Sequence, residues 1–353
     1  MITISPENCS IFVFKVGSIG DSIVAIPALK KIKDHYKGEF HLITNKPSNG
    51  ALSSWEVFKL TELFKDFFEF DFTIKSILQL RKFIKKEKKH KVIFYFADLS
   101  SFRRNFRNYL FFKAIGFSEV FGWKECIGSY IKRDSKGQLT EVKPEYKRLE
   151  GIVEKYIDKK YIFDVDYDFI KFNNLFIRET LEKYKFLDDP YFVIGLGGKT
   201  DIQRWNIDSY INIFKELNKE ITLVALGDSN DYDDVEKIKA LLPELKILNF
   251  CDKTSLHESA FILRKALFYF GNDTGTSHLA AIVKTKSIVI TSGRNNIGRW
   301  DPYGNLHTII RKRTECEGCF LFSSSDCKHN LSCMNEIDSN HVKKIIINEL
   351  SNY

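Results

Sequence analysis

One short segment of the sequence gathers the residue types that bind a phosphate group. The segment is Asp273, Thr274, Gly275, Thr276, Ser277 and His278. It follows an apolar run that ends in Gly271 and precedes Leu279-Ala280-Ala281, so we expect it to connect a strand to a helix. Hydroxyl groups, a glycine that lets an anion approach the backbone, and the N–H groups at the start of a helix are donors that suit a phosphate. We therefore predict an anion site. The alternative is an ordinary turn with an Asp or Thr helix cap.

A second segment of this kind lies near the N-terminus and contains a carboxylate. Gly20 and Asp21 follow the apolar run 11–14 and precede a helical pattern that begins near Ile23. Asp21 is thus expected near the carboxyl end of a strand, where open parallel sheets bind their ligands. A carboxylate in that position can take a proton from a hydroxyl group as a general base. The alternative role for Asp21 is to cap the helix that follows.

The elements that would position these segments alternate between strand and helix along most of the chain. Short runs of β-branched and aromatic residues indicate strands, and apolar residues at helical spacing indicate helices. The predicted strands are 11–14, 40–44, 67–72, 91–96, 191–196, 221–226, 245–249, 267–270 and 287–290. The predicted helices include 23–32, 76–89, 145–156, 207–218, 233–241, 255–265 and 338–353. This alternation predicts an α/β fold with doubly wound parallel sheets.

The alternation restarts after an irregular stretch, which predicts two domains. With 353 residues, of which 44% are apolar and 14% aromatic, the chain is long enough for two packed cores. We place a Rossmann-like N-terminal domain at 1–175 and a second one at 176–337. The final helix, 338–353, is expected to pack back on the N-terminal domain. Two such domains would leave a cleft between the carboxyl ends of their sheets.

The composition of the chain indicates where in the cell the protein is expected and which classes of partner it could bind. No apolar run reaches the ~18 residues that a membrane span requires. The N-terminus shows no basic leader and no small-residue cleavage site, so we expect a cytoplasmic protein. The formal charge of +8 suits an acidic partner, which could be nucleic acid, anionic lipid or a phosphorylated small molecule.

A basic helix is expected directly after the predicted strand 91–96. Arg103, Arg104 and Arg107 lie on it. Because a guanidinium group pairs with carboxylate and phosphate in a fork, these residues are candidates for binding an anionic acceptor. The alternative is a solvated helix face whose arginine stems cover aromatic residues.

Four of the seven cysteines have the spacing of a metal site. Cys316, Cys319, Cys327 and Cys333 form the pattern C-x2-C-x7-C-x5-C, in which four thiolates could hold zinc or iron. The residues between them are polar and loop-like, so a metal could order this segment. The remaining cysteines are isolated in the sequence and are expected to be small buried residues. They are Cys9, Cys126 and Cys251.

These motifs, taken in order, resemble the ADP-heptose:lipopolysaccharide heptosyltransferases, glycosyltransferase family 9. Gly20-Asp21 followed by Pro27-Ala28-Leu29 matches the family's GD-x5-PAL signature. Arg204-Trp205 matches its K/R-W element, and residues 273–281 match its D-T-G-x-S-H-L-A-A motif. The resemblance spans nearly the whole chain and implies the GT-B fold, in which two Rossmann-like domains face a central cleft.

The resemblance also implies an inverting glycosyltransferase and assigns roles to the matching residues. Asp21 would be the general base, and Arg204 would stabilise the charge of the leaving group, with no metal ion needed for catalysis. The residues that would form the donor site are Gly20, Gly198, Lys199, Gly227, Asp231, Asp273, Thr274, Gly275, Thr276, Ser277 and His278. Asp231 stands where the family often has a glutamate that binds the ribose, and His278 is expected to face the helix interior.

Three functions stay open from the sequence. The first is transfer of a heptose, or a related sugar, from an ADP-activated donor to the core of bacterial lipopolysaccharide, with peripheral contact at the inner membrane. The second keeps the fold but glycosylates protein Ser or Thr, or uses another nucleotide sugar, because Gly298-Arg299-Trp300 departs from the usual family loop. Some such relatives, which act on autotransporters, hold iron through a cysteine finger. The third is a basic cysteine-knuckle nucleic-acid-binding protein; against it, the aromatic residues lie in strand-like core runs. We therefore expect no nucleic-acid partner.

Overall fold

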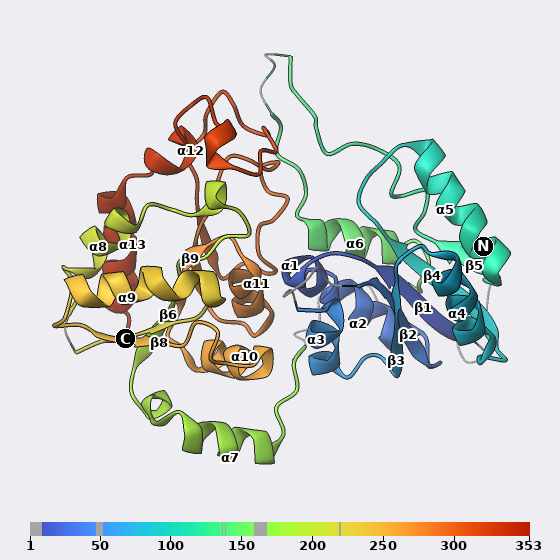
Figure 1. The fold of residues 1–353 in the computed structure, drawn as a ribbon, viewed down its shortest axis with the longest axis horizontal. Helices are drawn as coiled ribbons and strands as arrows, with labels where there is room; N and C mark the ends of the chain where they lie inside the picture. Colours follow the sequence, from blue (N-terminus) through green and yellow to red (C-terminus); the bar gives the residue numbers. More distant parts are fainter. Residues whose placement is uncertain (1–8, 47–51, 136, 138, 159–167, 219) are drawn as a thin grey trace. The chain divides into compact units, whose positions relative to one another are not determined.

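Two parallel β-sheets organise the chain, and each belongs to a compact unit of its own (Figure 1). The computed structural model describes residues 9–46, 52–135, 137, 139–158, 168–218 and 220–353. The first unit comprises the described residues of 1–132 and 143–171, and the second comprises those of 133–142 and 172–353. The prediction of an α/β fold with two doubly wound parallel sheets is confirmed.

The first sheet has five parallel strands in the order β3-β2-β1-β4-β5. They are β1 (Cys9–Lys15), β2 (Phe40–Asn45), β3 (Asp66–Phe70), β4 (His90–Phe96) and β5 (Glu119–Phe121). Every residue of the central strand β1 is buried, as expected for a strand that is covered on both faces. The short edge strand β5 gave too brief an apolar run to be predicted.

The second sheet has six parallel strands in the order β11-β10-β9-β6-β7-β8. They are β6 (Tyr191–Gly195), β7 (Thr222–Ala225), β8 (Lys246–Asn249), β9 (Tyr269–Asn272), β10 (Ser287–Ile290) and β11 (His307–Ile310). When the strands are numbered within this unit alone, their order is that of the Rossmann fold. In this fold the chain adds strands on one side of the first strand and then continues on its other side with the fourth strand. The edge strand β11 was not predicted.

Each unit also contains helices, most of which connect its strands. In the first unit they are α1 (Ile19–Ile23), α2 (Ile26–His35), α3 (Ser54–Phe58), α4 (Ile74–Lys85), α5 (Phe102–Ile115) and α6 (Glu145–Val153). In the second they are α7 (Asn174–Lys183), α8 (Ile207–Phe214), α9 (Tyr232–Leu241), α10 (Leu256–Lys265), α11 (Gly275–Ile282), α12 (Ser332–Asn335) and α13 (Ser339–Leu350). Within the described part of the chain, no helix has both the length and the apolar character needed to cross a bilayer.

The C-terminal helix belongs to the second unit, so the prediction that it packs on the N-terminal domain was wrong. Val342 and Ile346 of α13 are fully buried in the apolar core of the second unit. The helix packs against α8, and the Asn212 side chain donates a hydrogen bond to Ser339 Oγ (2.9 Å). The sequence pattern showed an apolar face correctly but did not show which core that face joins.

The short segment 133–142 also belongs to the second unit, although the sequence places it between elements of the first. The N–H of Val142 donates to the carbonyl of Ile297 (2.9 Å), and the Leu139 side chain is buried. The Arg313 guanidinium donates to the Leu139 carbonyl (3.4 Å). The predicted N-terminal domain of 1–175 included this segment, because nothing in its composition marks the exchange.

Candidate active site

The carboxyl ends of two strand pairs are the natural places for ligands in these sheets. In an open parallel sheet, the connections after two adjacent central strands leave on opposite faces and open a crevice between them. The pairs are β1 with β4 in the first unit and β6 with β9 in the second. The predicted site residues around Asp21 follow β1, and those around Gly198 and Thr274 follow β6 and β9.

Asp21 lies in α1, directly after the loop that leaves β1. Its Oδ2 accepts hydrogen bonds from the backbone N–H and the hydroxyl of Ser18, at 2.8 and 2.7 Å. Ser18 is the N-cap of α1, so the two residues form a capping box. The capping role that the sequence allowed is therefore present, and it holds the carboxylate in a defined position. The role of Asp21 as a general base stays a prediction.

Gly17 leaves room for the Asp21 side chain. Its φ of +144° lies in a region that residues with a side chain rarely adopt, and a Cβ added there would lie 2.4 Å from Asp21 Cβ. The Gly17 N–H donates to Asn45 Oδ1 (2.9 Å), which ties the loop to the end of β2. Gly20 lies in α1 between Ser18 and Asp21.

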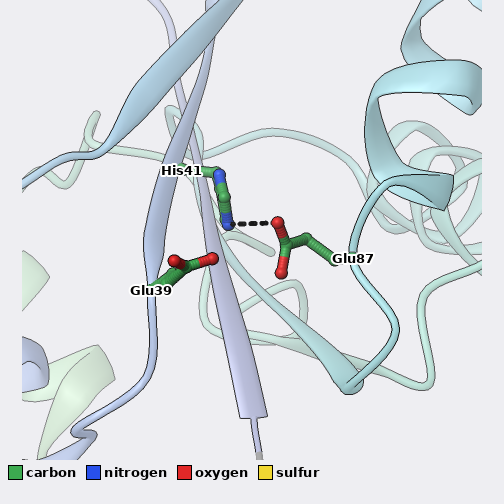
Figure 2. A group of neighbouring side chains, drawn as sticks. All are labelled: Glu39, His41 and Glu87. Atoms are coloured by element: carbon green, nitrogen blue, oxygen red, sulfur yellow. Dashed lines mark ion pairs between the residues drawn. The ribbon is translucent and has the colours of Figure 1, made fainter.

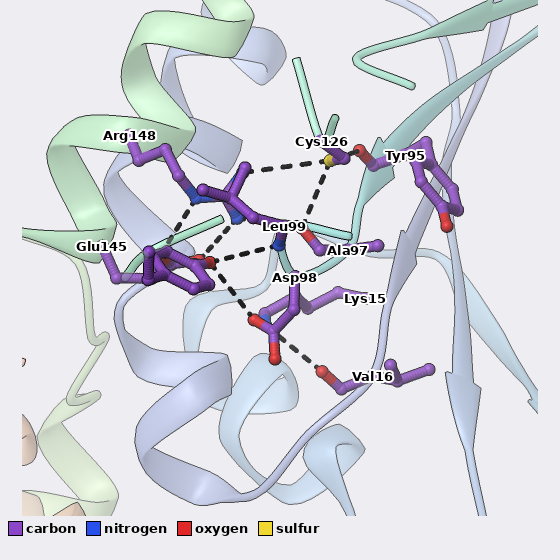
Figure 3. A network of polar contacts seen from close by, with 10 residues as sticks. Lys15, Val16, Tyr95, Ala97, Asp98, Leu99, Cys126, Glu145 and Arg148 are labelled. Carbon is purple, nitrogen blue, oxygen red and sulfur yellow. Dashed lines mark hydrogen bonds and ion pairs between the residues drawn. The ribbon is translucent and has the colours of Figure 1, made fainter. Parts of the chain in front are cut away.

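A buried polar network at the end of β4 was missed by the sequence interpretation (Figure 3). Arg148 of α6 donates to the Ala97 carbonyl (2.9 Å) and forms an ion pair with Glu145 (2.6 Å). The Tyr130 hydroxyl donates to Glu145 Oε2 (3.1 Å). Burial alone would lower the pKa of Arg148, but the hydrogen bonds and charge of Glu145 outweigh burial and raise it. The i, i+3 spacing of the pair on a helix was the available signal, and it is too common to single out.

The three isolated cysteines are buried, as predicted. One of them, Cys126, joins the network at β4, where its thiol donates to the Ala97 carbonyl (Sγ to O, 3.2 Å). Burial raises the pKa of this thiol. The thiols of these residues therefore act as packing groups.

In the second unit, the predicted anion turn forms the capped start of α11. Thr274 is the N-cap, and its hydroxyl accepts from the Thr276 N–H (3.2 Å). Ser277 Oγ accepts from the Thr274 N–H (3.1 Å) and donates to the Thr274 carbonyl (2.8 Å). Gly275 occupies the first helical position, where a backbone N–H has no partner inside the helix and is available to an anion.

The prediction that Ser277 offers its hydroxyl to a ligand needs correction. The residue is fully buried, and its hydroxyl is used within the capping box. Its hydroxyl therefore shapes the turn, and donor binding by this residue stays a prediction. Thr274 is the helix N-cap, which is the alternative role that the sequence left open, and it also lies in the predicted anion turn.

Asn272, the last residue of β9, is a second position that the sequence interpretation missed. Its side-chain amide donates to the carbonyls of Leu196 (2.6 Å) and Gly197 (2.9 Å), and its Oδ1 accepts from the Tyr210 hydroxyl (3.0 Å). It is fully buried. Asn272 therefore holds the loop after β6 beside the turn after β9, at the strand pair where a ligand is expected.

Arg204 follows that loop and is held by two carboxylates. Its Nη2 lies 2.5 Å from Asp231 Oδ1, and its Nη1 lies 3.1 Å from Asp234 Oδ2. Asp231 is buried, and burial raises its pKa, while the nearby Arg204 lowers it. Since Asp231 Oδ2 also accepts from the Asp228 N–H (3.1 Å), Asp231 acts here as a group that positions Arg204.

The glycines that the sequence singled out surround this ion pair. A Cβ added to Gly227 would lie 2.3 Å from Asp231 Oδ2, and one added to Gly198 would lie 3.0 Å from Arg204 Cγ. Both glycines therefore make room for the pair. Lys199 beside them is exposed. The structure thus brings together the predicted residues Gly198, Arg204, Gly227 and Asp231.

A pocket adjoins the anion turn at the ends of β9 and β10. Its lining includes Asp273, Gly298 and Trp300, and all its lining residues belong to the second unit. The buried ring of His278 lies with Nε2 3.4 Å from Asp273 Oδ1, so His278 orients this carboxylate from the helix interior. The guanidinium of Arg299 stacks on Trp300 (4.6 Å to the ring centroid). The loop that departs from the family pattern therefore forms a wall of this pocket.

Three of the four spaced cysteines lie around the fourth, Cys333. Burial raises the pKa of the Cys333 thiol, and the neighbouring sulfurs of Cys316, Cys319 and Cys327 raise it further. Among the described residues, no three of these Sγ atoms lie within 4.8 Å of one another. The thiol set suits zinc or iron, and binding would need the sulfurs to move closer together.

Comparisons with known proteins agree with this geometry. Residues 156–328 match the model of glycosyltransferase family 9 (heptosyltransferase). The chain is 22% identical to lipooligosaccharide heptosyltransferase 2 of Campylobacter jejuni serotype O:2, over 97% of this chain and 98% of that protein. The structure of Escherichia coli ADP-heptose LPS heptosyltransferase II is similar with a TM-score of 0.67 and 13% identity, covering 97% of this chain and 99% of the other. The iron-containing dodecameric glycosyltransferase TibC of enterotoxigenic E. coli gives a TM-score of 0.54 at 12% identity, covering 98% and 77%. The predicted resemblance and the GT-B fold are confirmed.

Proposed function

We propose that this chain, a glycosyltransferase with a family 9 heptosyltransferase domain, transfers a heptose from ADP-heptose to the core of lipopolysaccharide. The observation that carries the proposal is that Asn272, two residues before the capped helix start at Thr274, hydrogen-bonds the Gly197 carbonyl and the N–H of Trp205, the residue after Arg204. Together the helix start and Arg204 offer N–H donors and a positive charge at the strand pair where a diphosphate would be bound.

The proposed reaction is a single displacement. Asp21 takes the proton from an acceptor hydroxyl while that oxygen forms a bond to the anomeric carbon of the heptose. The bond from this carbon to the diphosphate oxygen breaks, and ADP leaves with its charge stabilised by the start of α11 and by Arg204. The configuration at the anomeric carbon is inverted. The reaction requires the sugar on the second unit to reach Asp21 of the first, and it uses no metal ion.

The test is a panel of donors and acceptors analysed by mass spectrometry. The full chain is incubated with ADP-heptose, ADP-glucose and UDP-sugars, each with a lipopolysaccharide-core acceptor or a Ser/Thr-rich peptide. We expect product from ADP-heptose and the core acceptor. Modification of the peptide alone, or use of another donor alone, would replace this function with the second one considered from the sequence.

One observation favours part of the second function, which is the use of a donor sugar other than heptose. Gly298 and Trp300 line the pocket beside Asp273, where the sugar of a bound donor would lie. Because this loop departs from the family pattern, a sugar related to heptose fits the proposal as well, and the donor panel separates the two.

The surface of helix α5 supports the proposal that the acceptor is an anionic glycolipid at the cytoplasmic face of the inner membrane. Phe102, Phe106 and Leu110 recur every four residues on the helix and are exposed at 54%, 38% and 50%. Arg103, Arg104 and Arg107 are exposed on the same helix. A helix with exposed aromatic residues and arginines is suited to lie on an anionic lipid surface.

Removing these charges should weaken binding to anionic vesicles. At roughly 1 kcal/mol for each arginine near the surface, the triple variant Arg103→Ala, Arg104→Ala, Arg107→Ala should lose on the order of 100-fold in vesicle affinity at low salt. Co-sedimentation with phosphatidylglycerol vesicles measures this. The matched control is Leu175→Ser, an exposed apolar residue on α7. Equal binding of the triple variant and the parent would remove α5 from the proposed membrane contact.

We also propose that the four spaced cysteines hold a structural zinc or iron ion. Elemental analysis of the purified chain should find about one such ion per chain, as expected for a site with four thiolate ligands. Cys319→Ser should lose this ion and lower the melting temperature, whereas Cys251→Ala should keep the ion. A metal content that is the same in Cys319→Ser and in the parent would contradict the site.

A further inference from the structure

A buried histidine lies at the amino end of the first sheet, the edge opposite the Asp21 loop. His41 is the second residue of β2 and pairs in register with Phe12 of β1 and Asp66 of β3. Its ring stacks on the ring of Phe12 (4.6 Å between centroids), and only 1% of the residue is exposed. The imidazole is therefore fixed in place and shielded from solvent.

Both ring nitrogens of His41 lie near carboxylates, but only one of them makes a hydrogen bond to a described residue. Nδ1 lies 2.5 Å from Asp66 Oδ1, and in the tautomer that donates this hydrogen bond Nε2 carries the lone pair. Nε2 is buried and has no hydrogen-bond partner among the described residues. It lies 3.5 Å from Glu87 Oε1. A buried nitrogen lone pair directed at a carboxylate is costly unless a further group lies between the two.

Two glutamates approach this nitrogen from different segments (Figure 2). Glu39 directly precedes β2, and Glu87 precedes β4. One ligand atom from each of Glu39, His41 and Glu87 lies within 4.8 Å of the others. Glu87 is oriented by the Ser10 hydroxyl, which donates to its Oε2 (2.7 Å) and leaves Oε1 toward His41. The Lys65 ammonium lies 2.9 Å from Glu39 Oε2, on an exposed side chain that is able to move into solvent.

We propose that Glu39, His41 and Glu87 bind a divalent cation of the zinc class. Imidazole nitrogen and carboxylate oxygen are both zinc ligands, and a water molecule would complete four-coordination with the three protein ligands. A histidine that ligates a metal commonly donates its other N–H to a carboxylate, which is the place of Asp66 here. The ion would link the start of β2 to the segment before β4, and the contact between His41 and Asp66 would extend this link to β3. The proposed transfer reaction does not use this edge of the sheet.

The test must separate this site from the four cysteines, which also suit zinc. Isothermal titration of Zn²⁺ into the full chain with Cys316, Cys319, Cys327 and Cys333 replaced by Ser should give one site. His41→Gln should abolish that site, and Asp66→Asn should weaken it by about 10- to 100-fold. Glu62→Gln, an exposed glutamate of the same unit, is the matched control and should bind like its parent.

Cobalt supplies a second readout if the cysteine-free chain does not fold. In the unaltered chain, Co²⁺ at a histidine–carboxylate site gives weak d–d absorption without thiolate charge-transfer bands. His41→Gln should remove this signal and leave any thiolate bands unchanged. Zn²⁺ and Co²⁺ binding that is the same with and without His41 would overturn the proposal. It would also be overturned by a chain that takes up no metal outside the cysteines.

Discussion

Replacing Asp21 with Asn should lower turnover by about three orders of magnitude and leave donor affinity nearly unchanged. The asparagine amide is neutral and does not take the acceptor's proton. It can still accept the hydrogen bond from the Ser18 N–H that Asp21 accepts at 2.8 Å, so the helix cap is kept. The substitution therefore separates the proposed base from the observed cap.

Two controls make this result specific. Asp34→Asn removes a carboxylate from α2 whose partner is Lys30 (2.8 Å), and it should leave turnover unchanged. The melting temperature of Asp21→Asn should stay close to that of the parent. If ADP-heptose affinity, measured by calorimetry, fell in proportion to turnover, Asp21 would belong to the donor site and another base would be needed.

Removing the charge of Arg204 should lower kcat by about 100- to 1,000-fold, because a charge held where the diphosphate leaves stabilises the transition state. Arg204→Gln alone would also leave the buried Asp231 without its partner, at a cost of about 3 kcal/mol. The informative variant is therefore Arg204→Gln combined with Asp231→Asn. It should regain the melting temperature and remain as slow as the single variant.

Steady-state kinetics and thermal unfolding of both variants check this expectation. Asp234→Asn is the matched control, since it removes the more exposed of the two carboxylates that contact Arg204 (3.1 Å) and should change kcat little. Recovery of parental turnover in the double variant would show that Arg204 contributes to folding alone.

Most of the fold could be predicted from the sequence, and so could the two turns of the candidate sites, whose roles stay predictions. Apolar runs such as 91–96 and 191–196 are recognisable because a central parallel strand is buried on both faces. The turns at Asp21 and Thr274 were recognisable because glycine, hydroxyl and carboxylate residues follow such runs directly. The capping boxes at both turns agree with the alternatives that the sequence left open.

The residues that were missed are polar groups buried by tertiary contacts. Asn272 and Arg148 are ordinary polar residues in the sequence, and they bond backbone carbonyls far along the chain. The packing of α13 was wrong for a related reason, because an apolar face does not specify which core it joins. Ser277 was misjudged because its hydroxyl is used by the backbone of its own turn.

The most direct test of the account is the structure of the reaction product. The chain is incubated with ADP-heptose of known anomeric configuration and a lipopolysaccharide-core acceptor, and the product is examined by mass spectrometry and NMR. We expect one added heptose per acceptor, an equal amount of released ADP, and an inverted anomeric carbon. Retained configuration, or release of ADP without a glycosylated acceptor, would contradict a single displacement in which Asp21 activates the acceptor.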